Sequence, residues 1–207
     1  MLQEAVINNS FRPPVAGSIR PAETNETERA AAVILMAFST DPVARWIYPE
    51  PADYFRHFPE FIRGMSGNAF KHGTAYVTNE FSGAALWLPP GVHSDEEALA
   101  ELIDDTVSET VREDLLLVME AMGTYHPDGP HWYLPMIGVD TPRQGRGVGD
   151  ELMRYALERC DTDGLPAYLE SSNSRNISLY ERWGFVSLGT IQFGNSAPLY
   201  PMVRWPR

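Results

Sequence analysis

Residues 138–149 carry the clearest chemical pattern of the chain, Gly-Val-Asp-Thr-Pro-Arg-Gln-Gly-Arg-Gly-Val-Gly. Glycine lets backbone N–H groups approach a phosphate closely, and the N-terminal end of a helix adds partial positive charge. With Arg143 and Arg146, the stretch predicts an anion-binding turn between a strand and a helix. It is neither a P-loop, which needs Gly-Lys-Ser/Thr, nor the dinucleotide fingerprint Gly-x-Gly-x-x-Gly. A tight turn that only packs is the alternative.

The sequence resembles the GNAT superfamily of acyl-CoA-dependent N-acyltransferases in two motifs. Residues 144–149 match the signature Q/R-x-x-G-x-G/A. Asn173 with residues 179–185 (Leu-Tyr-Glu-Arg-Trp-Gly-Phe) matches the second motif, N-x6-Y-x3-GF, at about the right distance. Within the superfamily, residues 169–176 and 179–182 are most similar to puromycin N-acetyltransferase and its relatives.

The resemblance implies that acetyl-CoA binds where a twisted sheet splays open. Backbone groups of the strand before the turn would pair with the pantetheine arm, and amides of the turn would hold the pyrophosphate. The implied cofactor residues are Ile137, Gly138, Val139, Gln144, Gly145, Arg146, Gly147, Val148, Gly149, Asn173 and Asn176. The two asparagines would bind the cofactor or orient the following helix, and turn or cap formation is their alternative role.

Acetyl transfer from a thioester to an amine needs a neutral amine, a stabilised oxyanion and a proton for the leaving thiolate. The resemblance assigns Tyr180 as the acid that protonates the thiolate; packing as a core tyrosine is the alternative. Glu170, at a predicted strand end, would act as base through water or anchor a cation, unless it only caps the next helix. His131 is a further candidate base. A backbone N–H near Met136 or Ile137 would contact the oxyanion.

These assignments predict an acetyl-CoA-dependent N-acetyltransferase that acts on a small-molecule amine by direct transfer in a ternary complex. Two alternatives stay open: a non-catalytic acyl-CoA-binding or sensor module, and a transferase that uses another acyl-CoA donor. Ser171 and Ser172 lack the Gly-x-Ser-x-Gly context of a hydrolase. The sequence contains no His-Glu-x-x-His motif and no calcium-type carboxylate spacing, so we expect no metal.

The elements that must position these residues follow from hydrophobic periodicity and from turn residues. We expect strands over residues 18–21, 74–78, 83–88, 132–139, 165–170, 185–193 and 199–205, and helices over 24–38, 48–64, 147–160 and 174–182. Residues 39–42 should break the first helix, and Pro135 suggests a bulge or a local split in the sheet. The order predicts an α/β (α+β) fold with three α/β/α layers. The resemblance adds a mixed, splayed, mostly antiparallel sheet of about six to seven strands.

Composition narrows the class of protein. The 207 residues are 43% hydrophobic and 21% charged, as in an ordinary globular protein. We expect a poorly ordered lead-in over residues 1–17, with neither signal peptide nor anchor, and a single acetyltransferase domain over 18–207. The only cysteine, Cys160, cannot form an internal disulfide and should lie in the core. A cytoplasmic protein is the expectation, and a homodimer is left open.

The net charge of −12 argues against nucleic-acid or anionic-membrane partners, which select basic surfaces. Residues 95–120 hold ten acids and one arginine, a net −9, with apolar residues at helical spacing. This predicts one long or two shorter amphipathic helices. A solvated acidic face is one interpretation. The other is that the segment, including Asp104 and Asp105, borders a site for a cationic acceptor.

Overall fold

The fold is built on a seven-stranded sheet in a computed structural model that describes residues 19–207. The expected lead-in, residues 1–17, lies outside the described residues. The strands are β1 (Ile19–Pro21), β2 (Ala75–Thr78), β3 (Gly83–Leu88), β4 (Trp132–Val139), β5 (Ala167–Ser171), β6 (Val186–Ser187) and β7 (Tyr200–Arg204). Their order in the sheet is β1-β2-β3-β4-β5-β7-β6. Only the β4–β5 pair is parallel, so the sheet is mixed and mostly antiparallel, as expected.

The sheet splays between β4 and β5, because these strands pair only at their first residues, Trp132 with Ala167 and Tyr133 with Tyr168. β4 stays paired with β3 as far as Val139. The edge of β4 that faces β5 therefore has no strand partner beyond Tyr133 in the described chain. This is the splay that the sequence resemblance predicts.

A bulge accompanies the start of the splay, as Pro135 suggested. Met136 pairs with Leu86 and Tyr133 with Leu88, so the register advances three residues along β4 for two along β3. The extra residue falls at Leu134–Pro135. Proline has no N–H to donate, so little strand pairing is lost where the two strands separate.

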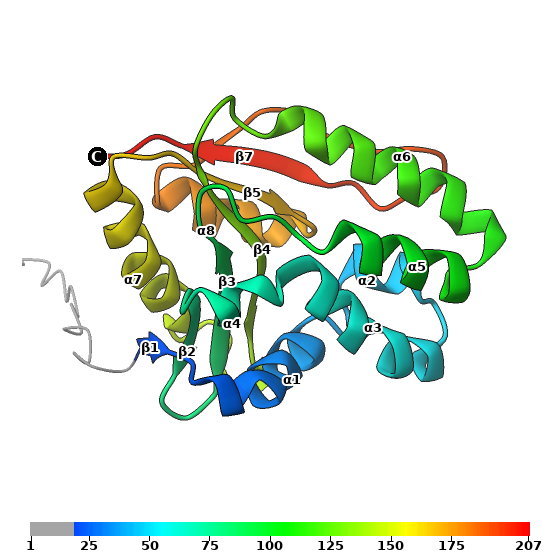
Figure 1. Cartoon of the computed structure of the whole chain (residues 1–207), viewed down its shortest axis with the longest axis horizontal. Coiled ribbons are helices and arrows are strands. Elements are labelled where there is room, and N and C mark those ends of the chain that lie inside the picture. Colours follow the sequence, from blue (N-terminus) through cyan, green and yellow to red (C-terminus); the bar gives the residue numbers. More distant parts are fainter. Residues whose placement is uncertain (1–18) are drawn as a thin grey trace, which may run out of the picture.

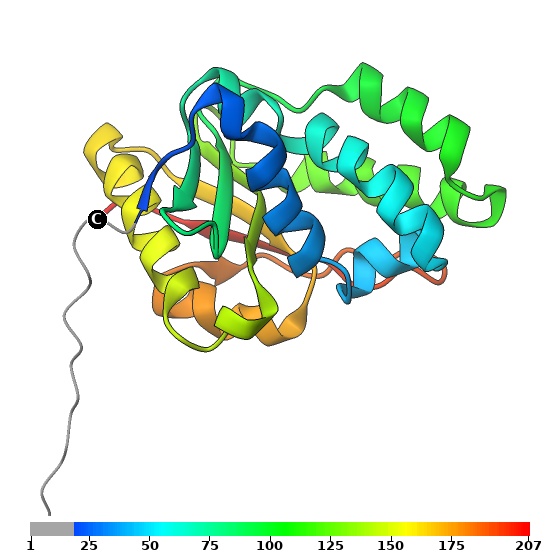
Figure 2. The same cartoon turned by 90° about the horizontal axis from the view of Figure 1, so that it is seen from below.

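Helices cover both faces of the sheet and make the expected three layers (Figures 1 and 2). One face packs against α1 (Thr27–Ala37) and α3 (Pro51–Ser66), and the other against α7 (Val148–Asp163) and α8 (Ile177–Arg182). All six residues of β3 are buried, with Ala84 and Leu86 in the first core and Ala85 and Trp87 in the second. Cys160 is buried in the second core, as expected.

Helices α5 (Glu96–Thr106) and α6 (Glu109–Tyr125) form the acidic segment, so the two-helix alternative is confirmed. They lie beyond α3, on the side of the molecule away from α7 (Figures 1 and 2). Among the described helices, none is long and apolar enough to cross a membrane.

Several element predictions need correction. The strand expected over residues 185–193 is wrong: β6 spans only Val186–Ser187, after which a single bridge joins Ile191 to Leu199. Val186 is 55% exposed, so this edge segment has little packing to hold a longer ladder. Two short helices were not expected, α2 (Pro42–Ile47) and α4 (Asn68–Lys71), and 3-10 turns lie over Thr24–Glu26, Thr141–Arg143 and Ser174–Asn176.

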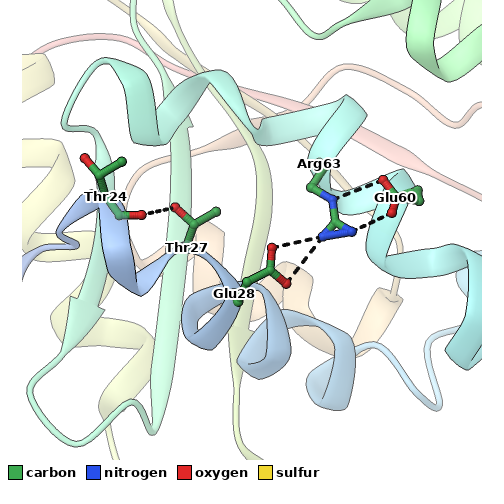
Figure 3. A network of polar contacts seen from close by, with 5 residues as sticks. All are labelled: Thr24, Thr27, Glu28, Glu60 and Arg63. Carbon is green, nitrogen blue, oxygen red and sulfur yellow. Dashed lines mark hydrogen bonds and ion pairs between the residues drawn. The ribbon is translucent and has the colours of Figure 1, made fainter.

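Exposed polar contacts join α1 to α3, as Figure 3 shows. Arg63 of α3 lies 3.2 Å from the Glu28 carboxylate of α1 and also binds Glu60 one turn earlier in its own helix. At the start of α1, the Thr27 hydroxyl donates to the Thr24 carbonyl at 2.9 Å. Ion pairs this exposed contribute little stability, so packing holds the two helices in place.

Candidate active site

A cavity of about 620 Å³ opens where β4 and β5 separate. Its walls come from α1, α2, α3, α6, β4, the end of β5, the glycine-rich turn and α8. The expected site residues line it with two exceptions: Arg146, which is exposed and does not line the cavity, and His131, the further candidate base. Residues far apart in the sequence thus meet at the splay, which is where the resemblance placed the cofactor.

The glycine-rich turn has the backbone conformation that only glycine adopts without strain. Gly145 and Gly147 have φ of 69° and 85°, and Gly147 is the N-cap of α7. A Cβ at either position would meet no atom within 4 Å, so backbone conformation rather than crowding requires glycine there. The long helix that follows points its N-terminus at the cavity through Val148 and Gly149, which suits an anion.

Side chains at this turn have structural partners. Gln144 donates from Nε2 to the Val139 carbonyl at 3.0 Å, so it ties the turn to the end of β4. Arg143 lines the cavity and lies 3.3 Å from the Glu80 carboxylate in an exposed pair. That weak pair leaves Arg143 available to an anionic ligand.

Ile137, Gly138 and Val139 line the cavity along the free edge of β4. The packing of α1 requires glycine at position 138, because a Cβ there would come 2.7 Å from the Ala37 side chain of α1. This glycine permits close packing of α1 on β4. The free backbone edge itself can pair with an extended ligand.

Asn173 and Asn176 line the cavity at the start of the helical segment that follows β5. The Asn173 side chain accepts the Arg175 backbone N–H at 3.1 Å, so it caps the 3-10 turn. The capping alternative therefore describes what this side chain does in the structure.

Tyr180 is buried on α8 and lines the cavity. Its hydroxyl has no hydrogen-bond partner among the described side chains and backbone groups, although its ring packs on Phe185. Burial, with the nearby Asp41 carboxylate, raises its pKa well above the usual 10. The phenol therefore stays protonated, and a hydrogen bond to a departing sulfur is better supported than complete proton transfer.

Glu170 lies near the end of β5, with its side chain 3% exposed, and lines the cavity. Burial raises its pKa to about 7, and the phenols of Tyr133 and Tyr168 oppose part of that rise. Within residues 19–207 its Oε1 accepts no hydrogen bond of normal geometry. A carboxyl that titrates near neutrality can take a proton from a bound amine.

His131 does not line the cavity. Its Nδ1 lies 2.8 Å from the Gly129 carbonyl and its Nε2 lies 2.9 Å from Nδ1 of His126. His126 in turn lies between His131 and Glu170, with Nε2 at 3.7 Å from Oε1 of the carboxyl. The direct role considered for His131 as a base is therefore less well supported than that of Glu170.

Asp41 is a cavity residue that sequence analysis placed only in a helix break. Its Oδ1 accepts the N–H groups of Val43 and Ala44 and so caps α2, while Oδ2 accepts the Ser172 hydroxyl at 2.6 Å. Burial raises its pKa despite these bonds. The dipeptide Asp-Pro was a usable signal, because aspartate favours the N-cap and proline the first helical position.

The acidic helices contribute only apolar side chains to the cavity, namely Leu115, Val118, Met119 and Met122 of α6. Of the ten acids in residues 95–120, all but Asp114 are exposed. Asp104 and Asp105 face solvent, and Asp104 pairs with Arg112. The structure therefore supports the solvated-face interpretation. In the part of the chain that it describes, no histidine, cysteine and carboxylate side chains group to hold a metal ion.

Comparison of the sequence with known proteins finds acetyltransferases. The acetyltransferase (GNAT) family model matches residues 46–185. An uncharacterised N-acetyltransferase of Schizosaccharomyces pombe is 27% identical over 201 aligned residues, which cover 89% of this chain and 81% of that protein.

Solved structures share the fold. A Corynebacterium glutamicum protein described as histone acetyltransferase HPA2 and related acetyltransferase superposes with a TM-score of 0.65 and 25% identity, covering 92% of this chain and 96% of that one. The polyamine N-acetyltransferase of Drosophila melanogaster superposes with a TM-score of 0.64 and 18% identity, covering 90% and 98%.

Proposed function

The chain belongs to the acetyltransferase (GNAT) family, and from that premise we propose that it transfers an acetyl group from acetyl-CoA to the amine of a small molecule. The transfer is direct, within a ternary complex. The observation that carries the proposal is one cavity that holds a buried carboxyl of pKa about 7, a protonated phenol and the glycine-rich turn. A base for the amine, a hydrogen-bond donor for the departing sulfur and an anion cradle for the donor are groups that suit acetyl transfer to an amine.

The residues present fit the donor of this family, acetyl-CoA. The amides of the turn around Gly145 and Gly147, at the N-terminus of α7, suit the pyrophosphate. The free edge of Ile137–Val139 suits the amide groups of the pantetheine arm. Bound there, acetyl-CoA supplies the activated acetyl group. Arg143 and Arg175 also line the cavity and add positive charge for the nucleotide phosphates, while Arg182, a further lining residue, is paired with Asp150.

The other end of the cavity favours an amine with an apolar body. Its wall is formed by Ile47, Phe58, Phe61, Met65, Val118 and Met122, while its carboxylates are those of Asp41 and Glu170. Asp41 attracts the ammonium group and Glu170 removes its proton. A puromycin-type acceptor has an amine on a large apolar body, and the polyamine acceptor of the Drosophila structural neighbour is a cation, so both classes belong in the test.

Calorimetry with acetyl-CoA tests the donor site. It compares the variant Gly147→Ala with a matched control variant, Gly123→Ala. Gly147 needs positive φ, whereas a Cβ on Gly123 of α6 meets open space. We expect the first variant to weaken acetyl-CoA binding about tenfold and the second to leave it unchanged. Absence of acetyl-CoA binding by the unmodified chain would overturn the proposal.

A thiol-reactive dye detects free CoA when the chain is mixed with acetyl-CoA and phenethylamine, tryptamine, puromycin, agmatine or spermidine. Transfer to an amine, verified by mass spectrometry, supports the proposal. Tight donor binding without transfer to any amine favours the binding-module alternative. Propionyl-CoA and succinyl-CoA in the same assay test whether another acyl donor is preferred.

A further inference from the structure

A chain of polar contacts leads from the cavity wall to the surface through two histidines. His126 Nε2 lies 3.7 Å from Glu170 Oε1, His126 Nδ1 lies 2.9 Å from His131 Nε2, and His131 Nδ1 lies 2.8 Å from the Gly129 carbonyl. Glu170 lines the cavity, whereas neither histidine does. The carboxyl therefore stands between the cavity and the histidine pair.

The hydrogen bonds fix which ring nitrogens carry protons. A carbonyl oxygen only accepts, so Nδ1 of His131 must be the donor to Gly129. A neutral His131 then has a bare Nε2, which requires a proton on Nδ1 of His126. A neutral His126 consequently presents a bare Nε2 to Glu170, where it can accept a proton from the carboxyl.

We propose that His126 and His131 form a proton relay that carries to solvent the proton that Glu170 removes from the amine. The inference rests on the proposed function. The ammonium N–H breaks as the Glu170 O–H forms, and the O–H breaks as the His126 Nε2–H forms. His126 then gives its Nδ1 proton to Nε2 of His131, and the resulting imidazolium loses a proton to water. Exchange with water returns both rings to their starting tautomers, so each turnover exports one proton.

The surroundings of His126 suit transient rather than stable protonation. The rings of Tyr168 and Tyr133 pack on it at 4.3 and 4.7 Å, and His93, His131 and Glu170 are the titratable groups that face it otherwise. Burial lowers its pKa to about 4, against about 7 for Glu170, so the first transfer is unfavourable by a factor of about 1,000. Its position as the C-cap of α6 favours the passing positive charge.

The contact between His126 and Glu170, at 3.7 Å, is longer than a hydrogen bond. Catalytic contacts of this kind commonly tighten when substrate binds. The absence of another hydrogen-bond partner for Glu170 Oε1 among the described residues leaves this approach open. A relay also explains why a buried carboxyl is backed by two histidines instead of apolar side chains.

The kinetic test uses full-length His126→Ala with acetyl-CoA and the panel amine that gives the highest kcat/KM. His72→Ala is the matched control, because His72 is exposed at the end of α4 and lies outside the described cavity. We expect His126→Ala to lower kcat at least about tenfold at low buffer concentration, with both KM values nearly unchanged. Added imidazole should restore much of the rate, because it can replace the lost ring. An unchanged kcat, or a loss that imidazole does not restore, would overturn the relay.

Histidine tautomers give a readout that needs no acceptor. In long-range ¹H–¹⁵N spectra of the full chain, the relay requires the Nδ1–H tautomer for both His126 and His131 near pH 7. An Nε2–H tautomer at His126 would overturn it. If no amine is acetylated, the proposed function fails, and the spectra still decide whether the histidines are arranged as a relay.

Discussion

At the residue scale, burial of the Glu170 carboxyl disfavours its ionised form in the folded chain. The pKa is about 7 in the folded chain against 4.5 for an unperturbed glutamate, so the folded chain binds more protons between these two values. The stabilising contribution of this protonation is present below about pH 4.5 and is lost as the pH rises through about 7. Above pH 7 the ionised carboxylate costs the fold about 3 kcal/mol, and the proposed role of Glu170 as a base requires that ionised form.

The variant Glu170→Gln separates the effect of the ionised carboxylate on stability from its effect on activity. At pH 8 we expect the variant to be more stable than the unmodified chain by up to about 3 kcal/mol, with the difference shrinking toward pH 5. Urea unfolding at the two pH values measures this. Equal differences at pH 5 and pH 8 would show that Glu170 does not titrate between them.

Kinetics give the other half of the Glu170 prediction. We expect kcat/KM of the unmodified chain to rise with pH around 7, as the base form of Glu170 accumulates. We expect Glu170→Gln to lower kcat/KM at least about a hundredfold and to abolish its rise with pH. The pH profile of kcat/KM for both proteins measures this. A variant that keeps the profile would point to another base.

Tyr180→Phe removes only a hydroxyl that faces the cavity without a partner among the described residues. Since the ring still packs on Phe185, we expect normal stability and normal acetyl-CoA affinity. We expect kcat to fall at least about tenfold, because the departing sulfur loses its hydrogen-bond donor. Steady-state kinetics and donor calorimetry measure the two effects. Equal losses of affinity and turnover would instead indicate a structural role.

The sequence could predict that Tyr180 and Glu170 line the site because each lies in or beside a local motif. Asp41 and His126 lie in no such motif. Asp41 reaches the cavity because α2 begins beside the end of β5, and His126 reaches Glu170 because α6 ends above β5. These contacts join residues about 130 and 44 positions apart, which local periodicity does not record.

At the scale of elements, prediction succeeded where burial determines the pattern. The span of β4 matches its expected bounds because an apolar run bounded by turn residues fits a central strand. The edge segment after Phe185 alternates like a strand but has one pairing neighbour, so only β6 and an isolated bridge form. The sequence does not predict α2, because Pro42 indicates a helix break there, whereas in the structure Pro42 is the first residue of a capped helix.

A buried and an exposed arginine, each in an ion pair that joins two elements, should differ in their contribution to stability. Arg204 of β7 is 4% exposed and makes two 2.8 Å bonds to Asp161 of α7, while Arg63 is 38% exposed beside Glu28 and Glu60. We expect Arg204→Gln to cost about 3 kcal/mol, since it leaves a partly buried carboxylate without its partner, and Arg63→Gln under about 1 kcal/mol. Urea unfolding compares them. Equal costs would mean that water reaches Asp161 as easily as it reaches Glu28.

At the scale of the whole molecule, the net charge of −12 is divided between surface and site. The exposed acids of α5 and α6 lie on the solvent side of helices that give the cavity only apolar side chains. The cavity has charges of its own, because Arg143, Arg175, Arg182 and Asp150 line it together with the carboxyls of Asp41 and Glu170. Long-range attraction by the surface acids is weakened by salt, while contact with a buried carboxylate is screened far less.

A comparison of Asp41→Asn with the double variant Asp104→Asn, Asp105→Asn tests whether the cavity carboxyl or the surface acids attract the amine. Asparagine can still cap α2 through its Oδ1, and its Nδ2 can donate to the Ser172 hydroxyl oxygen, so the first change removes charge with little loss of structure. We expect it to raise the KM of a cationic acceptor such as agmatine about tenfold or more, because a hydrogen bond to a charged group is lost, while the KM for acetyl-CoA stays unchanged. The double variant removes two solvated charges outside the cavity and should leave both values unchanged at physiological salt. If it raised the acceptor KM as much as Asp41→Asn does, the acidic helices and not the cavity would select the amine.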